Sequence, residues 1–447
     1  MDMKLYLIFL TYGTLHGTVL AVCIFTVKVF AASLTRVLVI LAIVMLSVAF
    51  LLSLWQLVSF CSFCGCHFSV SCHHRNLCVC VCVCVCVCVC PCVSRRVLMV
   101  GMFLGLLSLV MISLPLIETK TRKPVEWVVD PNHKKLVHEY VHKVLEGPCR
   151  PSGTRQSLLT QFPASGHVIQ PFLWKDKPLP DDLFLYPPPF GFRGLESKIA
   201  NLLKLFSAPQ PEKTPGKCQR CLVLGNGGIL KGLELGSVFD RFDILIRLNS
   251  GPLGEFTVDV GNRTSIRMSY PEGTPLHWVD TDPHTLFVAV VYKRVDISWI
   301  SAMINKLAVP LWDWLFFWQK VPDQIPLEPS RFRLLNPHVI RQTALDLLKY
   351  PPPRPRLWGW DQNVPTLGVS ALNLASLLCD EVSLAGFGYN LSQQEAPLHY
   401  YDHLPMSAML QEKMHNVDRE TQLLQSLVRA GTITDLTGGI HCTFCKS

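Results

Sequence analysis

The 447-residue sequence has few charged residues and no block of basic side chains. Asp, Glu, Lys and Arg make up only 17% of it, and 41 basic against 33 acidic side chains leave a net charge of +8. Proteins that bind nucleic acids concentrate Lys and Arg on one face or helix, so this composition argues against a nucleic-acid partner. The mild positive balance suits a smaller anionic ligand instead.

Charge is scarce near the N-terminus. Residues 97–117 contain no charged side chain, and this stretch is long enough to cross a bilayer as a helix. Arg95 and Arg96 precede it, as the positive-inside rule requires for a cytoplasmic N-terminus, so we predict one transmembrane signal-anchor there. Two other apolar stretches, about 4–30 and 36–60, are alternative spans. Three spans would leave the rest of the chain on the same side.

Cysteine is concentrated in the same part of the chain. Of the 19 cysteines, eight alternate between residues 78 and 92, mostly with Val. Alternating thiols on a strand would be prone to oxidation, and zinc sites need pairs of Cys joined by a turn. Because TGT and GTG encode Cys and Val, a TG dinucleotide repeat translates into this pattern. We interpret part of the low-complexity segment 1–96 as translated intron or an aberrant gene model.

The remaining chain has the pattern of a globular α/β domain. We expect a short stem at 118–130 and one lumenal domain at 131–447, which begins with an amphipathic helix at 131–145 and a loop-rich stretch at 151–215. Beyond it, apolar runs alternate with helical patterns, which predicts a largely parallel sheet between helices. The runs expected to form strands are 221–225, 243–248, 286–292, 332–335 and 382–387.

A glycine-rich turn lies between the first two of these runs. Gly225, Gly227 and Gly228 follow the first run, and we expect a helix next, an arrangement that lets backbone approach a phosphate or ribose. A dinucleotide-binding oxidoreductase would place an acidic residue at the end of the second strand. Here Asp243 begins that run and Arg-Leu-Asn ends it, which disfavours this alternative.

Four segments, in order, resemble the motifs of one enzyme family. Residues 218–270 resemble the large sialylmotif of animal sialyltransferases, 364–388 the small sialylmotif, 399–402 the third motif and 415–420 the final His-x4-Glu motif. The resemblance to this family, glycosyltransferase family 29, covers roughly 127–440. It implies a GT-A-like variant fold with a single Rossmann-type α/β/α domain, and CMP-sialic acid as the donor. No metal or other cofactor is expected, because the donor carries a single phosphate.

Segments outside the four motifs indicate the acceptor. The sequences IRMSYPEGTPL, FVAVVYKRVD, FFWQKV, RLLNPHVI and LTGGI resemble family members that act on lactosylceramide. The resemblance implies alpha-2,3 transfer to the terminal galactose of this lipid by a single-pass type II protein of the Golgi membrane, and it leaves a homodimer open. Two alternatives remain. One is a sialyltransferase that acts on galactose of other glycolipids or glycoproteins, and the other is a catalytically inactive membrane protein.

The resemblance also assigns catalytic roles. His415, in the last motif, would take the proton of the acceptor hydroxyl, and His is the natural base near neutral pH. His399 would contact the phosphate or carboxylate of the donor, or else only pack in an aromatic cluster. Tyr400 would donate through its hydroxyl. Glu420 supports the site, either by orienting the His or by capping a helix.

Four further residues are expected to contact the nucleotide. Asn226 and Asn249 carry amides that can read ribose, phosphate or the cytosine edge, although Asn249 also suits a turn. Thr366 and Gly368 begin a helix in the small motif, where Thr366 alternatively serves as an N-cap. Related enzymes often carry Tyr before the small-motif Pro; Val364 stands here, so other donors must hold the phosphate.

The last expectations concern disulfides, glycans and one apolar segment. By resemblance Cys221 pairs with Cys379, and Cys149 with Cys218, whereas a C-terminal Cys-x-x-Cys has no assigned role. The aromatic-rich segment 311–318 either meets the ceramide or bilayer or forms a buried helix, and we favour the buried helix. Two sequons are candidate glycosylation sites, Asn262 and Asn390.

Overall fold

The computed structural model describes Gly105 and residues 127–166, 169–206, 216–353, 363–389, 392–411 and 414–445. The segment 1–96 and the predicted signal-anchor at 97–117, apart from Gly105, lie outside the described residues. The chain divides into two units, Met1–Leu114 and Pro115–Ser447, and every strand and helix below belongs to the second. Within the described ranges, none of the helices combines the length and apolar character that a bilayer crossing requires.

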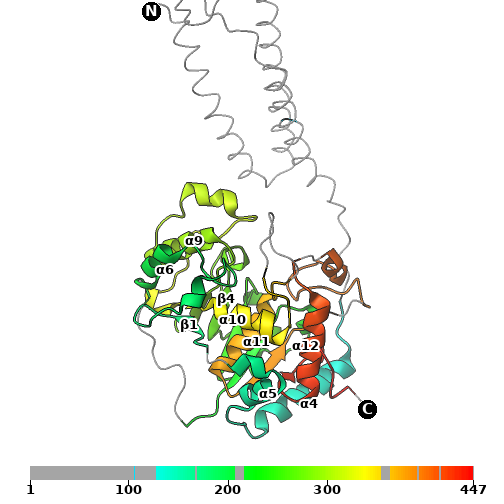
Figure 1. The fold of residues 1–447 in the computed structure, drawn as a ribbon. Coiled ribbons are helices and arrows are strands. Elements are labelled where there is room, and N and C mark those ends of the chain that lie inside the picture. The colour runs from blue at the N-terminus through cyan, green and yellow to red at the C-terminus, as the bar shows by residue number, and fades with distance from the viewer. Residues whose placement is uncertain are drawn as a thin grey trace, which may run out of the picture. The chain divides into compact units, whose positions relative to one another are not determined.

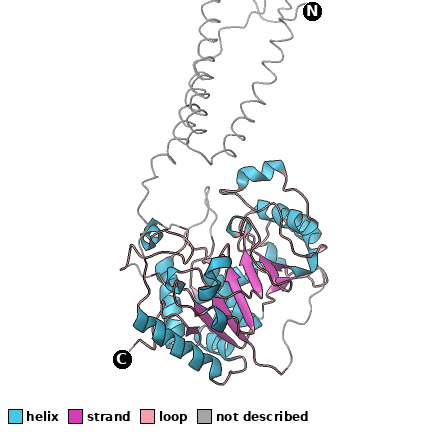
Figure 2. Ribbon diagram, turned by 180° about the vertical axis from the view of Figure 1, so that it is seen from behind, coloured by secondary structure: helices cyan, strands magenta, loops and turns pink. Residues whose placement is uncertain are grey.

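The described domain is built on one eight-stranded sheet, drawn in magenta in Figure 2. The strand order is β1-β6-β5-β4-β3-β2-β7-β8, and all neighbours are parallel except β1 and β6. The predicted, largely parallel sheet is therefore confirmed. The strands are β1 (Phe172–Leu173), β2 (Arg220–Leu224), β3 (Ile244–Leu248), β4 (Ile266–Ser269), β5 (Leu286–Ala289), β6 (Phe332–Leu335), β7 (Glu381–Ala385) and β8 (Thr434–Asp435).

Helices of very different lengths connect these strands (Figure 1). The expected helix at 131–145 is confirmed as α4, whereas the loop-rich prediction for 151–215 was wrong in part because α5 and α6 lie there. The helices are α4 (Pro131–Glu146), α5 (Gly153–Gln161), α6 (Glu196–Leu203), α7 (Gly236–Phe239), α8 (Thr257–Val260), α9 (Arg294–Asn305), α10 (Pro337–Gln342), α11 (Leu367–Leu378) and α12 (Val417–Arg429).

Apolar side chains project from both faces of the sheet, because successive strand residues point to opposite sides. In β2, Cys221 and Val223 belong to the core beneath α11, whereas Leu222 and Leu224 pack with Val137 of α4 on the other face. A third core, around Trp299 of α9, covers the β5 and β6 end of the sheet. The two covered faces give a three-layer α/β/α arrangement.

The helix expected after the glycine turn is present only as a short helix that does not begin at the turn. A short 3-10 turn, η3 (Gly228–Leu230), follows β2 instead, and α7 has only four residues. A Cβ on Gly228 would lie 2.1 Å from the carbonyl oxygen of Pro397, and Gly227 pairs with His399 in an isolated antiparallel bridge. The glycines therefore admit the third motif against the turn, rather than starting a long helix that faces a phosphate.

Disulfides fasten the N-terminal part of the domain and the centre of the sheet. Both predicted pairs, Cys149–Cys218 and Cys221–Cys379, are present. The second joins the start of β2 to the residue after α11, which links the large and small motifs. The C-terminal Cys-x-x-Cys, which had no expected role, forms a third disulfide between Cys442 and Cys445.

The segment 311–318 is not the buried helix that we favoured. It contains a 3-10 helix, η6 (Leu311–Phe316), visible as the yellow-green helix beyond α9 in Figure 1. Trp314 and Phe317 pack against the core around α9, whereas most of the other apolar side chains of the segment face solvent. The apolar composition of this segment therefore does not mean that its side chains are buried.

Candidate active site at the carboxyl ends of the strands

The strand order fixes where a ligand site is expected. From β2 the chain moves outward through β3, β4, β5 and β6, and it then returns to β7 on the other side of β2. In open α/β sheets, ligands bind outside the carboxyl ends of the strands at such a switch point. The loops that follow β2 and β7, 225–228 and 386–388, therefore mark the centre of the candidate site.

These two loops touch through backbone. The Gly227 amide donates to the Gly386 carbonyl at 3.0 Å, and a Cβ on Gly225 would lie 2.5 Å from the same oxygen. Gly386 itself has a φ of +70°, a conformation that favours glycine. Only residues without side chains allow the loops to approach this closely.

The third motif lies directly on the glycine turn. The Tyr400 amide donates to the Asn226 carbonyl at 3.1 Å, and the Gly228 amide donates to the Leu398 carbonyl at 3.0 Å. The Asn226 side-chain amide donates to the Leu248 carbonyl at the end of β3. Asn226 and His399, about 170 residues apart in the sequence, thus lie on two backbone segments that are hydrogen-bonded side by side.

Phe387 connects the glycine turn to the small motif. A Cβ on Gly225 would lie 3.1 Å from the Phe387 ring, and a Cβ on Gly368 would lie 2.7 Å from it. The ring therefore occupies the space that glycine leaves at both positions. Gly368, in the first turn of α11, is placed beside the carboxyl ends of β2 and β7 by this contact.

A residue of the final motif is hydrogen-bonded to the start of α11. Glu420 is 4% exposed and accepts two hydrogen bonds from Thr366, one from its amide at 2.7 Å and one from its hydroxyl at 2.6 Å. Thr366 is also the N-cap of α11, as one of the two interpretations of its sequence expected. Of the two expected roles for Glu420, holding a helix terminus is the one that these contacts describe.

His415 binds the same segment two residues earlier. Its Nδ1 lies 2.8 Å from the Val364 carbonyl oxygen. A carbonyl only accepts, so Nδ1 carries the hydrogen, and Nε2 of the neutral ring is then the nitrogen with the basic lone pair. The geometry thus gives His415 the tautomer that a general base requires. The Val364 side chain is buried in the core.

His399 is oriented by a carboxylate and an aromatic ring. Its Nδ1 lies 2.7 Å from Oδ2 of Asp402, and its ring is parallel to that of Tyr401 at 5.2 Å between centroids. A protonated ring paired with Asp402 would present Nε2–H as a donor. The ring is about one-third exposed, so it can meet a ligand.

Asn249 directly follows β3 and has a left-handed backbone conformation with a φ of +52°. Its side-chain oxygen lies 3.3 Å from the Ser269 hydroxyl, and a Cβ on Gly273 would be 2.3 Å from it. The backbone carbonyl of Asn249 accepts from Arg267 at 2.6 Å. The amide is thus fixed against the carboxyl end of β4.

Sequence reasoning missed the buried ion pair beneath this loop. Arg267 and Asp280 are both fully buried and form two hydrogen bonds, and Arg267 also donates to the Gly251 carbonyl. Neighbouring Arg247 bonds only backbone carbonyls and Thr264, and burial, with Arg267 second, lowers its pKa to about 10. The pattern Ile-Arg-Met-Ser, with its charge inside an apolar run, was the available signal.

The ion pair also engages an Asp-Thr-Asp sequence at 280–282, whose two carboxylates would otherwise be candidate metal ligands. Asp280 is engaged by Arg267 and by the Thr264 hydroxyl at 2.5 Å, and Asp282 accepts from the His284 amide. Among the described residues, no group of three or more His, Cys, Asp or Glu side chains converges as metal ligands would. The metal-free reaction remains a prediction.

The other predicted residues fall around this centre. The Tyr400 hydroxyl donates to the Pro252 carbonyl at 2.7 Å, and burial raises the pKa of Tyr400. Its proton is therefore used within the protein, and a contact of Tyr400 with the donor stays a prediction. Asn262 is exposed, as a glycosylated residue must be, and Asn390 lies outside the described residues.

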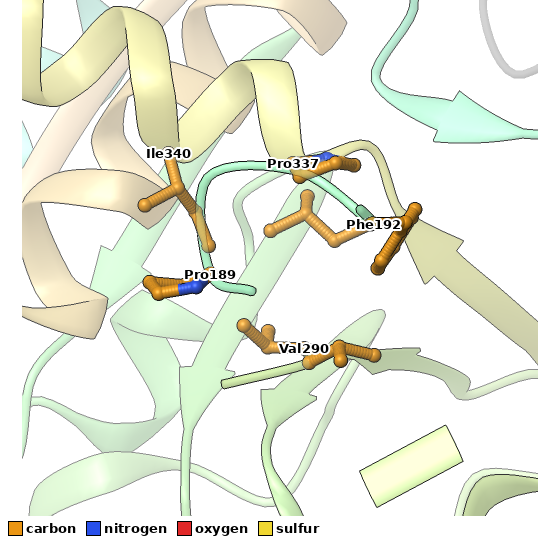
Figure 3. A pocket seen from close by; sticks show the side chains of 7 residues that line it. Pro189, Phe192, Val290, Pro337 and Ile340 are labelled. Carbon is orange, nitrogen blue, oxygen red and sulfur yellow. The ribbon is translucent and has the colours of Figure 1, made fainter. Parts of the chain in front are cut away.

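A small apolar pocket lies at the carboxyl ends of β5 and β6 (Figure 3). Pro189 lines it from a loop, Pro337 and Ile340 from α10, and Val290 from the residue that follows β5. No titratable side chain lines it, and none of the predicted donor or catalytic residues does. It lies at the same edge of the sheet as the candidate site, and its lining carries no group that could act in catalysis.

Comparisons with known proteins give the following similarities. A sequence profile of glycosyltransferase family 29 (sialyltransferase) matches residues 172–432. Lactosylceramide alpha-2,3-sialyltransferase of Rattus norvegicus is 47% identical over 316 residues, which are 70% of this chain and 82% of that protein. CMP-N-acetylneuraminate-beta-1,4-galactoside alpha-2,3-sialyltransferase of Homo sapiens is 37% identical over 306 residues, 66% of this chain and 78% of that protein. A crystal structure of a mammalian sialyltransferase in complex with Gal-beta-1-3GalNAc-ortho-nitrophenol has a TM-score of 0.49 and 22% identity, covering 64% of this chain and 98% of that one.

Proposed function

Because the chain belongs to glycosyltransferase family 29, the sialyltransferases, we propose that it transfers sialic acid from CMP-sialic acid to lactosylceramide. The new alpha-2,3 linkage is to the terminal galactose, and the product is the ganglioside GM3. The observation that carries the choice of acceptor is 47% identity over most of a lactosylceramide enzyme, against 37% for an enzyme named for a galactoside acceptor. The three-layer architecture with one mostly parallel sheet supports a GT-A-like variant fold.

The proposed reaction is an inverting displacement at the anomeric carbon of sialic acid. The galactose hydroxyl attacks this carbon, its proton passes to Nε2 of His415, and the bond from carbon to the CMP phosphate breaks. CMP leaves with the electron pair of that bond. The support for His415 is its hydrogen bond to the Val364 carbonyl, which fixes the basic nitrogen as Nε2 and the ring beside the start of α11.

Other residues of the site are proposed to hold the donor. Asn226 and Asn249 lie at the carboxyl ends of β2 and β3, where the nucleotide is expected, and Thr366 and Gly368 start α11 next to them. His399, paired with Asp402, is proposed to donate to the leaving phosphate as negative charge develops there. Glu420 positions Thr366 and has no direct part in the chemistry.

The proposal places the enzyme in the Golgi membrane as a single-pass type II protein with residues 131–447 in the lumen. The uncharged stretch 97–117 supports the anchor. The disulfides of the described domain support an oxidising compartment, because such bonds persist in secretory organelles and are rare in the cytosol. A homodimer stays a prediction.

The acceptor is tested by giving the purified full chain CMP-sialic acid with either lactosylceramide in detergent or a glycoprotein that ends in galactose. The expected product is sialylated lactosylceramide, identified by mass spectrometry and by its sensitivity to an alpha-2,3-specific sialidase. Transfer to the glycoprotein alone would keep the family and overturn the acceptor. No transfer to either acceptor by folded protein would favour the inactive alternative.

A further inference from the structure

Six of the fourteen large apolar side chains that are exposed in the described chain lie in one short segment. We define the aromatic patch as the exposed side chains of this segment, between residues 307 and 318. Large contiguous apolar patches on a protein surface mark interaction sites. The members and their exposed fractions are Leu307 62%, Leu311 61%, Trp312 61%, Leu315 57%, Phe316 66% and Trp318 70%.

The patch is held in place by its inner side. Trp314 and Phe317 pack against the core around α9, and the Phe317 ring lies beneath the Lys293 ammonium at 4.9 Å. The segment therefore has apolar side chains on both sides, inward toward the core and outward toward solvent. A surface that faces only water would carry polar side chains on its outer side.

Glu272 ties the patch to the candidate active site. Glu272 is 2% exposed; it pairs with Lys293 at 2.8 Å and accepts from the Trp318 amide at 3.4 Å. The neighbouring residue Gly273 lies against the Asn249 side chain, as the close approach of their atoms described above shows. Glu272 and Gly273 thus link Trp318 of the patch to Asn249, a predicted donor-binding residue.

The predicted signal-anchor lies close to the described domain in the sequence. The continuous described domain begins at Trp127, and only residues 118–126 separate it from the predicted signal-anchor at 97–117. Nine extended residues span at most about 30 Å. Two Trp side chains with an apolar body and a polar N–H suit the interface between lipid and water.

We propose that the aromatic patch inserts into the surface of the bilayer that holds the glycolipid acceptor, so that the sugar head group meets the active site while the lipid stays in the membrane. This inference rests on the proposed function for the identity of the acceptor. The contact with the bilayer is the new element, and it explains why this segment exposes apolar side chains although its inner side packs on the core.

The first test separates a lipid acceptor from a soluble one. The full chain is reconstituted in phosphatidylcholine vesicles that contain lactosylceramide, as wild type, as the double variant Trp312→Ser/Phe316→Ser, and as Val258→Ser. Val258 is an equally exposed apolar residue outside the patch, at 63% exposure, and serves as the matched control. Each variant is also assayed with a water-soluble lactoside.

For the double variant, kcat/KM on vesicle lactosylceramide should fall roughly tenfold or more, because burial of one aromatic side chain corresponds to about that factor. On the soluble lactoside it should change less than about twofold, as for other surface substitutions. Equal losses on both acceptors, or no loss on the vesicle acceptor, would overturn the proposal. Wild-type protein inactive on both acceptors would refute the proposed function instead.

A second measurement decides the bilayer contact without any activity. Brominated phosphatidylcholine quenches tryptophan emission on contact, so the quenched fraction is compared for wild type and Trp312→Phe in vesicles of this lipid. We expect the quenched fraction to fall in the variant. Equal quenching of the two proteins would show that Trp312 does not meet the bilayer, whatever reaction the enzyme performs.

Discussion

Glu420 offers the sharpest test of how the motifs cooperate, because its two possible roles predict different measurements. The structure has its buried carboxylate accept both hydrogen bonds of Thr366, 54 residues away. Hydrogen bonds to a charged group contribute about 1.5–3 kcal/mol each to stability. Glu420→Ala removes both and should lower the free energy of unfolding by about 3–5 kcal/mol. Glu420→Gln keeps one acceptor oxygen and should cost about 2 kcal/mol.

The assay is thermal and denaturant unfolding of the full chain, with kinetics at varied CMP-sialic acid. Roughly 2 °C of melting temperature is expected per kcal/mol in a domain of this size. Asp418→Asn is the matched control, because Asp418 lies in the same first turn of α12 but is exposed. A double-mutant cycle with Thr366→Val should give a coupling energy of about 1–3 kcal/mol.

Kinetics distinguish a role of Glu420 in holding Thr366 from a direct effect of Glu420 on His415, the proposed base. If Glu420 holds the start of α11, Glu420→Gln should raise KM for CMP-sialic acid and leave the pH profile of kcat unshifted. A shifted profile with unchanged stability would mean that Glu420 acts on His415. Equal stability of Glu420→Gln and Asp418→Asn, with a coupling energy near zero, would refute the reasoning.

Three further predictions address the fold around the site. Gly228→Ala places a Cβ 2.1 Å from the Pro397 carbonyl oxygen, so it should displace the third motif. We expect kcat/KM to fall severalfold while the far-ultraviolet circular dichroism spectrum stays nearly normal. Unchanged kinetics would contradict the contact. Cys379→Ser opens the bridge to Cys221 and should lower stability by about 5 kcal/mol in the chain-entropy model, measured by unfolding without reductant; a loss that reductant reproduces in the wild type confirms the cause. Burial raises the pKa of Asp296 to about 6, above its unfolded value of about 4, so its ionisation destabilises the fold as pH rises through that window. Asp296→Asn should therefore gain stability relative to wild type between those pH values in denaturant titrations, and a constant difference would argue against the shift.

The five predicted strands could be found because apolar residues predominate in each run, and burial on both faces demands such runs. β4 was missed because Arg267 and Ser269 alternate with its apolar residues, and only the partner Asp280 makes that arginine acceptable in the core. Helix α5 was missed because it begins after Ser152 in a left-handed conformation, with no side-chain cap to signal it.

The site could be predicted in part, because the motifs name residues but not their contacts. The hydrogen bonds of His415 and Glu420 to residues 364–366 depend on how α12 packs beside α11, which no local spacing encodes. Likewise, hydropathy showed that 311–318 is apolar but could not decide its burial, because the segment is apolar on both sides.

The most direct test of the account is sialyl transfer from CMP-sialic acid to lactosylceramide by the full chain, compared for wild type, His415→Ala and His142→Ala. His142 is an exposed histidine on α4 and controls for loss of an imidazole as such. We expect GM3 from wild type and His142→Ala, and a loss of kcat of roughly 100-fold or more for His415→Ala in protein that remains folded, with a melting temperature only about a few degrees lower. Full activity of folded His415→Ala would contradict the assignment of the base and, with it, the central claim.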